Sequence, residues 1–508
     1  MPILRDFTRF DEVLLPLWFR ECTPKVLVVT DGLNYNAGSD FGLTRFVDAL
    51  RASTIHGMTP IVRTATHTPG SATPASLNAA TQHISNFQFA DPAHGVLKSR
   101  YDVVFMLSID GESDPGLGAD AGGLAALTAF MQAGGGVFAT GDHEDLGAAM
   151  CMTVPRVRAM RRWAAADTPS AGGTDRLTTN LPGSDDAYEF SDQADALPQR
   201  LFVNYRTVAG GVGAAHPVLQ VPGSTRAIEV FPDHPHEGAC VVPTDLSTLL
   251  ADGITAEWPV ETGGAAVVVP EAIALTVSHG NAFPGKAAVE PNAFIPICAY
   301  DGQRAGVGRV VTDATWHHVV NVNLVGLTGR NLDDVHRYYA NLALWLMPKN
   351  VRRCLRYPLL VSELLRYPLF EEIPPIPPEK LPGPRLRELG ALIEIALLKR
   401  HSAATVRTLM DDALEEVLPA AGRQALDSFD RRFGEISSRE AGLAALAGLT
   451  LATGATAREL QRRDVKEHAD EVFHKAVAES IRTGVLRYLG DARDDLRRLD
   501  RVIESLVR

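Results

Sequence analysis

The stretch Gly134–Gly147, GGGVFATGDHEDLG, decides the fold that this sequence predicts. Its glycines lead into a short apolar run, Val137–Thr140, which stops at GDHED. A short apolar run bounded by turn signals is typical of a buried parallel strand. Open α/β sheets bind ligands just past the carboxyl ends of such strands. That position is taken here by a run of ionisable side chains, Asp142, His143, Glu144 and Asp145.

Two interpretations of this acidic turn are open. Burying an unpaired carboxylate is costly, so a functional site at the turn needs solvent, a metal ion or a counter-charge. The alternative is a solvated loop that caps the next helix, since acidic residues are favoured at the start of a helix.

Strand ends of the same kind recur along the chain. Three further apolar runs end at an aspartate, namely Asp31, Asp110 and Asp313, and Trp316-His317-His318 follows the last of them. Because the carboxyl ends of parallel strands lie on one edge of a sheet, we expect these side chains to converge on one crevice. A further run, Ala227–Phe231, is expected to add a strand. The segment after it, Asp233–Glu237, either joins the site or is a turn with solvated histidines.

Length and pattern divide the chain into parts. A chain of 508 residues is too long for one ordinary core. Strands and helices alternate up to residue 347, which predicts an α/β domain with a doubly wound, mainly parallel sheet and a strand-rich insertion at about residues 164–300. The proline-rich segment 348–384 is predicted to be a stiff linker. Residues 385–508 have a helical pattern and predict an all-α helical bundle.

The formal charge of −12 comes from the first part of the chain. Residues 351–508 carry 26 Lys/Arg and 25 Asp/Glu, which leaves 23 basic and 36 acidic residues before them. Such an acidic balance argues against a nucleic-acid partner. It is compatible with cation binding or with plain solubility.

The cysteines and the apolar segments indicate a cytoplasmic protein. The five cysteines are far apart and form no CxxC pair, so neither a thiolate zinc site nor a disulfide framework is predicted. A reducing cytoplasm fits this usage, and the charged N-terminus does not look like a signal peptide. The uncharged run Ala441–Ala457 is short and weakly hydrophobic, so we expect a packed core helix and no membrane span.

A basic helix is expected at Met150–Trp163, directly after the acidic turn. It contains four arginines, Arg156, Arg158, Arg161 and Arg162. These side chains either face an anionic ligand across the crevice or pair with nearby carboxylates on a solvated face, and we favour the second interpretation.

The converging side chains suit two kinds of chemistry. Hard cations take oxygen ligands, and zinc or iron-type sites add histidine. We therefore expect a divalent metal site formed by Asp31, Asp142, His143, Asp313 and His317. A metal-bound water with Glu144 as base would give a hydrolase or lyase. Alternatively, Asp142 or Glu144 acts with His317 in metal-free proton transfer. The predicted catalytic residues are Asp142, His143, Glu144 and His317.

Three motifs in residues 25–347 resemble the class I glutamine-amidotransferase-like superfamily, especially its trehalose-utilisation-type branch. They are KVLVVTDG at 25–32, GGGVFATGDH at 134–143, and GVGRVVTDATWHH at 306–318 with the closing NLALWLMP at 341–348. The resemblance implies a flavodoxin-like fold with the site at the strand ends. It also implies a carbohydrate-like substrate, because that branch is associated with sugar metabolism, and His317 matches its turn histidine.

Amidotransferase chemistry does not carry over. That reaction needs a cysteine in the turn after the central strand, because the thiolate is the nucleophile. The turn offers Gly141, Asp142 and His143, and Cys151 comes too late. Two hypotheses follow. The chain is an enzyme acting on a small polar substrate, or it is a non-catalytic module whose C-terminal helices contact a protein partner or a second copy.

Overall fold

The computed structural model describes residues 19–142, 145–164, 199–207, 213–232, 238–278, 292–366, 376–418, 437–463 and 469–507, together with Gly422, Ala425 and Leu426. Two predicted catalytic residues, His143 and Glu144, lie outside this described part, and so does the segment 233–237. The other predicted site residues are described.

A nine-stranded sheet forms the centre of the α/β part. Its parallel strands are β1 (Lys25–Thr30), β2 (Ile61–His67), β4 (His83–Phe87), β5 (Val103–Leu107), β6 (Gly136–Thr140) and β16 (Val310–Asp313). All residues of β5, β6 and β16 are buried, as expected for parallel strands that are covered on both faces. The predicted strands before Asp31, before Asp110 and before the central acidic turn, and the one that ends at Asp313, are therefore confirmed.

The order of the strands locates a crevice. The sheet runs β12-β15-β16-β6-β5-β1-β2-β4-β3. Short antiparallel strands close its edges, namely β3 (Ser76–Asn78), β12 (Glu271–Ala272) and β15 (Ile297–Tyr300). Chain order reverses between the neighbours β1 and β5, since β2 follows β1 on one side and β6 follows β5 on the other. Ligands bind at such a reversal in open α/β sheets.

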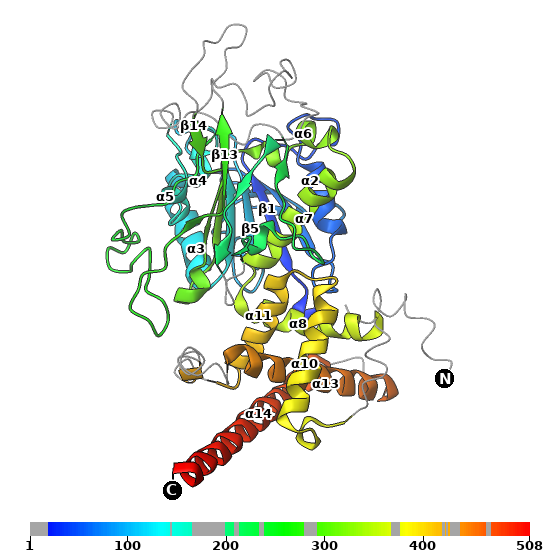
Figure 1. Cartoon of the computed structure of the whole chain (residues 1–508). Coiled ribbons are helices and arrows are strands. Elements are labelled where there is room, and N and C mark those ends of the chain that lie inside the picture. Colours follow the sequence, from blue (N-terminus) through cyan, green and yellow to red (C-terminus); the bar gives the residue numbers. More distant parts are fainter. Residues whose placement is uncertain are drawn as a thin grey trace.

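Helices cover both faces of the sheet (Figure 1). Val26 and Val28 pack in one core cluster with α2 (Thr44–Ala52) and α7 (Gly329–Leu346). Leu27 and Val29 pack in the other with α3 (Ala121–Gln132), α4 (Ala148–Cys151) and α5 (Val157–Met160). Alternate residues of a strand point to opposite faces, so the mostly parallel sheet has two cores. The predicted α/β architecture is confirmed at this level.

The insertion between β6 and β16 contains small sheets. Its strands are β7 (Gln199–Arg200), β8 (Phe202–Val203), β9 (Arg206–Thr207), β10 (Gly213–Ala214), β11 (Val230–Phe231), β13 (Ala274–Ser278) and β14 (Asn292–Phe294). The run Ala227–Phe231, a possible further strand of the main sheet, lies in the insertion instead. Only β11 is a strand there, and it pairs antiparallel with β7. A short apolar run has the same sequence pattern whether its strand belongs to the main sheet or to a small separate sheet.

The prediction of one helix over Met150–Trp163 is wrong. Helix α4 ends at Cys151 and α5 begins at Val157, with Pro155 between them. Proline lacks a backbone N–H and clashes with the preceding turn, which disfavours a helix that runs through this position. Arg161 has extended backbone and bridges to Cys240.

The C-terminal part is helical and shares a core with the α/β part. Its helices include α8 (Lys349–Arg366), α10 (Gly383–Leu398), α11 (Ala403–Glu415), α13 (Ser438–Arg463) and α14 (Ala469–Val507). One apolar cluster runs from β1 through Leu355 and Leu359 of α8 to Ile393, Leu446 and Ile481. The segment predicted as a linker therefore contains an 18-residue helix whose apolar stripe is buried.

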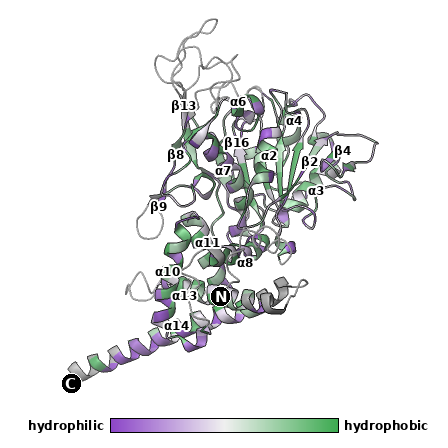
Figure 2. Ribbon diagram, turned by 90° about the vertical axis from the view of Figure 1, so that its right-hand side faces the viewer, coloured by the Kyte–Doolittle hydropathy of each residue, from purple (hydrophilic) through white to green (hydrophobic). Residues whose placement is uncertain are grey.

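Helix α13 contains the run Ala441–Ala457, and much of it is buried, as expected for a core helix. Among the described residues, no helix has both the length and the apolar character needed to cross a membrane. Figure 2 shows hydrophilic residues along the projecting part of α14.

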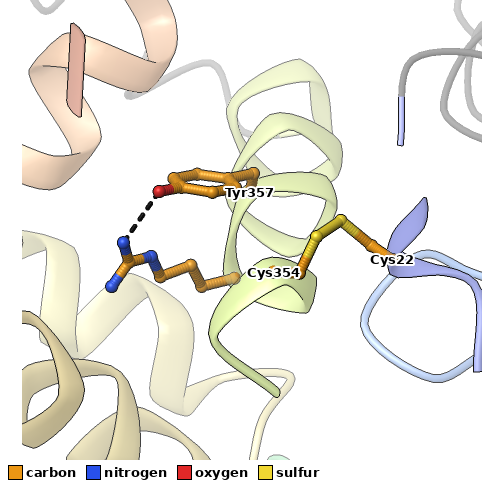
Figure 3. Close-up of a disulfide and its surroundings, with 4 residues drawn as sticks. Cys22, Cys354 and Tyr357 are labelled. Atoms are coloured by element: carbon orange, nitrogen blue, oxygen red, sulfur yellow. Dashed lines mark hydrogen bonds between the residues drawn. A yellow bond between two sulfur atoms is a disulfide. The ribbon is translucent and has the colours of Figure 1, made fainter. Parts of the chain in front are cut away.

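Cys22 and Cys354 form a disulfide, which the sequence did not predict. Their Cα atoms are 5.2 Å apart, although 332 positions separate them in the chain. Figure 3 shows the bond between the segment before β1 and helix α8, close to Tyr357, whose hydroxyl accepts a hydrogen bond of 2.7 Å from Arg356. The spacing of distant cysteines says nothing about their pairing, because the fold brings them together.

Candidate active site

The parallel strands end in register at one edge of the sheet. Thr30 lies opposite Leu107, Leu107 opposite Thr140, and Thr140 opposite Asp313. Neighbouring strands in a sheet are about 4.8 Å apart. The residues that directly follow these ends, Asp31 among them, are therefore arranged side by side, as the sequence predicted.

The turn after β6 is closed by its own backbone. The amide of Asp142 donates to the carbonyl of Leu146 at 2.9 Å. Gly147 has a φ of 98°, a conformation that glycine adopts without strain. A Cβ atom on Gly141 would lie 2.2 Å from the carbonyl oxygen of Leu146. The glycines at both ends of GDHEDLG are thus required by the tight closure.

Asp142 and His317 form a buried pair. Nε2 of His317 lies 3.4 Å from Oδ2 of Asp142, and both side chains are 0% exposed. Oδ2 also accepts a hydrogen bond of 2.9 Å from the hydroxyl of Thr315, which in turn accepts from the amide of His317 at 3.0 Å. The turn after β6 and the turn after β16 are joined in this way.

The other ring nitrogen of His317 indicates which atom faces Asp142. Nδ1 of His317 lies 2.7 Å from Oδ1 of Asn323, an acceptor, so Nδ1 carries a hydrogen. Nε2 of a neutral ring is then an acceptor facing a carboxylate oxygen. The contact with Asp142 is attractive only when an imidazolium or a carboxylic acid supplies a proton. The contact is longer than a proton-transfer hydrogen bond of about 2.6–3.2 Å, as is common before a substrate binds.

Asp313 belongs to a different network. Its Oδ2 accepts from Nδ1 of His318 at 2.9 Å and from the hydroxyl of Tyr338 at 2.8 Å. Tyr338 lies on α7, whose side chains cover one face of the sheet. The structure therefore pairs Asp313 with His318 and not with His317, which the sequence grouped with it.

Asp31 lies at the reversal between β1 and β5. Oδ1 accepts from the amide of Ile109 at 2.8 Å, and Oδ2 accepts from the hydroxyl of Ser108. The side chain is partly exposed. Burial of the carboxyl group, with a smaller contribution from the nearby charge of Asp110, raises the pKa of Asp31 to about 6. A carboxyl group with this pKa exchanges protons near neutral pH.

Two more ionisable groups flank Asp31. Burial and the charge of Asp114 raise the pKa of Asp110. His67 ends β2, and its Nδ1 lies 3.0 Å from the carbonyl oxygen of Phe87. Burial lowers the pKa of His67, so the ring is neutral at neutral pH. In the described part of the chain, Nε2 of this buried ring has no hydrogen-bond partner.

The arginines after the turn are structural. The predicted pairing with a carboxylate is confirmed for Arg158, whereas the predicted solvated face is wrong for Arg156 and Arg161, which are buried. The buried guanidinium of Arg161 donates to the carbonyl of Asp142 at 2.5 Å and to that of Ala314 at 2.8 Å. It thereby ties the turn after β6 to the turn after β16. Arg156 is buried too and donates from Nε to the carbonyl of Glu257 at 2.9 Å. Arg158 pairs with the carboxylate of the same Glu257 at 2.5 Å.

The described residues do not fit a metal ion. Within the described ranges, no group of three or more His, Cys, Asp or Glu side chains could hold one. Of the predicted ligands, Asp142 and His317 meet, Asp313 turns to His318, and Asp31 is held by Ser108. His143 lies outside the described residues, and no step is derived through a metal.

Sequence reasoning missed the groups that orient these side chains. They are Ser108, Thr315, Asn323, His318 and Tyr338. Ser108 and Thr315 could have been found, since each lies within two residues of a strand end. Asn323 and Tyr338 carry no such signal, because they reach the edge from the helices α6 (Asn321–Val325) and α7.

The fold and this edge define a doubly wound α/β protein with a cluster of acidic and imidazole groups at the strand ends. No protein-family model matches the chain, and neither a curated protein nor a solved structure is significantly similar to it.

Proposed function

We propose that the chain is an enzyme, a hydrolase or lyase, that moves protons on a small polar substrate at the carboxyl edge of the sheet. The observation that carries the proposal is the contact between Asp142 and His317. We infer that this buried carboxylate and this buried imidazole share a proton. A buried pair of this kind is costly in a turn with a purely structural role.

Asp31 supplies the second group. It is partly exposed, lies where the chain order of the sheet reverses, and has a pKa of about 6. Two groups whose environments separate their proton affinities can act as acid and base. In this mechanism Asp31 exchanges a proton with the substrate, and the pair Asp142–His317 holds a second proton beside it.

We further propose that residues 25–347 are a flavodoxin-like member of the class I glutamine-amidotransferase-like superfamily and that the substrate is carbohydrate-like. Five neighbouring strands lie in the order β2, β1, β5, β6 and β16 across the sheet. Renumbered one to five along the chain, they have the order 2-1-3-4-5, which is that of flavodoxin-like sheets and supports this proposal. Amidotransferase activity is not proposed. Cys151 is buried, and its burial raises the pKa of its thiol well above the usual range, so it is no nucleophile.

The test is turnover of a panel of chromogenic glycosides, esters and phosphate esters by the full-length protein. We expect wild-type turnover of at least one class, and a loss of about 100-fold or more in Asp31→Asn and His317→Gln. The matched control is Asp102→Asn. The pKa of Asp102 is also raised to about 6 by burial, but this residue precedes β5 at the opposite edge. No turnover of any class, or equal turnover in all variants, contradicts the proposal.

The metal-dependent version depends on His143 and Glu144. Elemental analysis of the purified wild type beside the double variant Asp142→Ala/His317→Ala decides it. Stoichiometric metal in the wild type that is lost in the double variant would support a metal site. Equal metal content in both proteins would exclude a metal site formed by Asp142 and His317.

Assembly through α14 is a second candidate function. The helix has 39 residues and projects from the body of the protein (Figure 1). Its sequence places apolar residues with alternating spacings of three and four, at Val485, Leu489, Ala492, Leu496, Leu499, Ile503 and Leu506. Such a repeat is typical of a coiled coil. Light scattering that gives a monomer mass for the wild type would exclude self-association, whereas a dimer lost in Leu496→Asp would support it.

A further inference from the structure

A cavity of about 350 Å³ lies between the α/β part and the C-terminal helices. Arg309, which precedes β16, and Asp301, which follows β15, line it together with Arg352 of α8 and the start of α11. Asp313 ends β16 at the carboxyl edge. The cavity is therefore at the opposite edge of the sheet from Asp31 and Asp142. Figure 1 shows α8 and α11 below the α/β part and α6 at its upper end.

The charged groups around this cavity are paired, with one exception. Arg309 donates to Asp301 at 2.6 Å, Arg206 lies 3.0 Å from Glu271, and Arg407 lies 4.0 Å from Asp411. Asp412 lies 3.7 Å from Arg353. Each of the lining carboxylates thus lies near an arginine, although Arg353 also pairs with Glu415, at 2.6 Å.

Arg352 is the exception. Its Nη2 donates to Oε1 of Gln303, a neutral amide, at 2.6 Å. No carboxylate of the described residues is within ion-pair distance of its guanidinium, and its buried Nε has no hydrogen-bond partner there. Burial, and to a smaller extent the charge of Arg309, lower the pKa of Arg352 to about 10, so it is still a cation at neutral pH. The carboxylates of Asp412 and Asp301 attract this cation, but neither forms an ion pair with it.

The histidines of the wall do not add to this charge. Burial and the nearby charges of His401 and Arg352 lower the pKa of His56 to about 3. Burial also lowers the pKa of His216 well below its usual range. Both rings are neutral at neutral pH. Four arginines and four carboxylates line the cavity, so its wall has no net charge, and among the described residues Arg352 is the one lining arginine without an ion pair.

The start of α11 adds a second, independent preference for an anion. Ser402 caps this 13-residue helix by accepting from the amide of Thr405 at 3.1 Å, and the amide of Ala404 donates to Gln220 at 3.1 Å. The amide of Ala403, the first helical residue, has no partner among the described residues. Ala403 and Ala404 line the cavity. Free amides and the helix dipole favour an anion at this place.

The remaining wall is apolar. Leu344, Trp345 and Leu409 line the cavity, and the last two are nearly inaccessible to solvent. A volume of this size is at the lower end of the range for small-molecule sites, about 300–1,000 Å³. The wall suits a short apolar body attached to a charged group.

We propose that this cavity binds a small organic monocarboxylate, with the carboxylate between Arg352 and the start of α11 and the apolar body against Leu344, Trp345 and Leu409. The guanidinium has the planar geometry that matches a carboxylate. Only one lining arginine is outside an ion pair and four carboxylates line the same wall, so a monoanion is favoured over a dianion. This inference goes beyond the proposed function and does not depend on it.

The test is calorimetric titration of the full-length protein with acetate, butyrate and benzoate, each at up to about 10 mM. Benzamide is the neutral counterpart of benzoate, and inorganic phosphate is the competing oxyanion. We expect benzoate or butyrate to bind, benzamide to bind at least about tenfold more weakly, and phosphate to bind more weakly as well.

Variants locate the site. Arg352→Gln should raise the Kd of the bound carboxylate about tenfold or more. Arg352→Lys should raise it less, because a lysine keeps the positive charge but lacks the planar, two-pronged donor geometry of the guanidinium. Arg407→Gln is the matched control, because Arg407 lines the same cavity but is exposed and lies near Asp411. The proposal is overturned if no carboxylate binds, if benzamide or phosphate binds as tightly, or if Arg352→Gln leaves the Kd unchanged. The comparison of benzoate with benzamide holds even if a variant fails to fold.

Discussion

Nε2 of His317 and Oδ2 of Asp142 face each other at 3.4 Å although 175 positions separate the two residues in the sequence. The two strands that bring them together, β6 and β16, are direct neighbours in the sheet. Nδ1 of His317 lies against Oδ1 of Asn323, and the proposed mechanism places one proton between Nε2 and Asp142. Substitutions that keep the shape of a side chain but change its protons therefore test the mechanism separately from the packing.

Asp142→Asn should separate the chemistry from the fold. An asparagine has the same shape and can donate its amide hydrogen to Nε2, so the free energy of unfolding should change by less than about 1.5 kcal/mol. The shared proton is lost, and we expect activity to fall about 100-fold or more. Asp142→Leu, which leaves Thr315 and His317 without their acceptor, should in addition destabilise the protein by about 1–3 kcal/mol. Chemical denaturation and turnover measure the two effects, and full activity in Asp142→Asn would rule out the proton-transfer role.

Asp31 should make the protein less stable as the pH rises. Its folded pKa of about 6 is above the ordinary value of 3.8, so between these values the folded state binds more protons than the unfolded state. The free energy of unfolding therefore falls as the pH rises from 3.8 to 6, and the penalty is fully present above pH 6. Asp31→Asn should remove it, making the variant more stable than the wild type at pH 7 by about 1–3 kcal/mol.

The control for this pH dependence is a comparison below the unfolded pKa. At about pH 3.5 the stability difference between Asp31→Asn and the wild type should be close to zero, because Asp31 is then protonated in both states. A difference that does not vary with pH would show that the substitution acts through packing and not through the proton.

Reduction of the disulfide between Cys22 and Cys354 should destabilise the protein. The bond closes a long loop, which restricts the unfolded chain, and the loss should be about 2–5 kcal/mol. Thermal unfolding with and without dithiothreitol measures it. The double variant Cys22→Ala/Cys354→Ala should unfold at the lower temperature under both conditions. If dithiothreitol shifts the double variant as much as the wild type, another process is responsible.

Glu257→Gln should lower the free energy of unfolding without changing the catalytic residues. Glu257 is buried, and its carboxylate accepts from the amide of Arg156 and from the guanidinium of Arg158. Removing one partner of a buried ion pair costs about 3–5 kcal/mol, although the partly exposed Arg158 places this pair at the lower end. Arg407→Gln, in the exposed pair with Asp411, should cost less than about 1 kcal/mol. Similar losses in both variants would contradict this account of the buried cluster.

The strands and the location of the candidate site could be predicted from the sequence. Val26–Thr30 and Val137–Thr140 are continuous apolar runs because they are covered on both faces, and the aspartates that follow them lie at one edge because the strands are parallel. The sheet to which the run Ala227–Phe231 belongs could not be predicted, since a short run does not reveal which strand it pairs with.

The partners of the site residues could not be predicted. Asp313 and His317 are only four positions apart, yet Asp313 faces Tyr338 and His317 faces Asp142. Strand residues alternate between faces, and the tight turn Trp316–His318 turns the second histidine back toward the strand. Which imidazole meets which carboxylate is decided by this turn and by α7. The disulfide depends in the same way on the packing of α8.

The central claim, that Asp31 exchanges a proton with the substrate, is tested most directly by the pH dependence of kcat/KM for a substrate that the wild type converts. The account predicts an apparent pKa near 6 in the wild type and in Asp102→Asn, and its disappearance together with most of the activity in Asp31→Asn. A profile without an inflection near pH 6, or one that persists unchanged in Asp31→Asn, would contradict it.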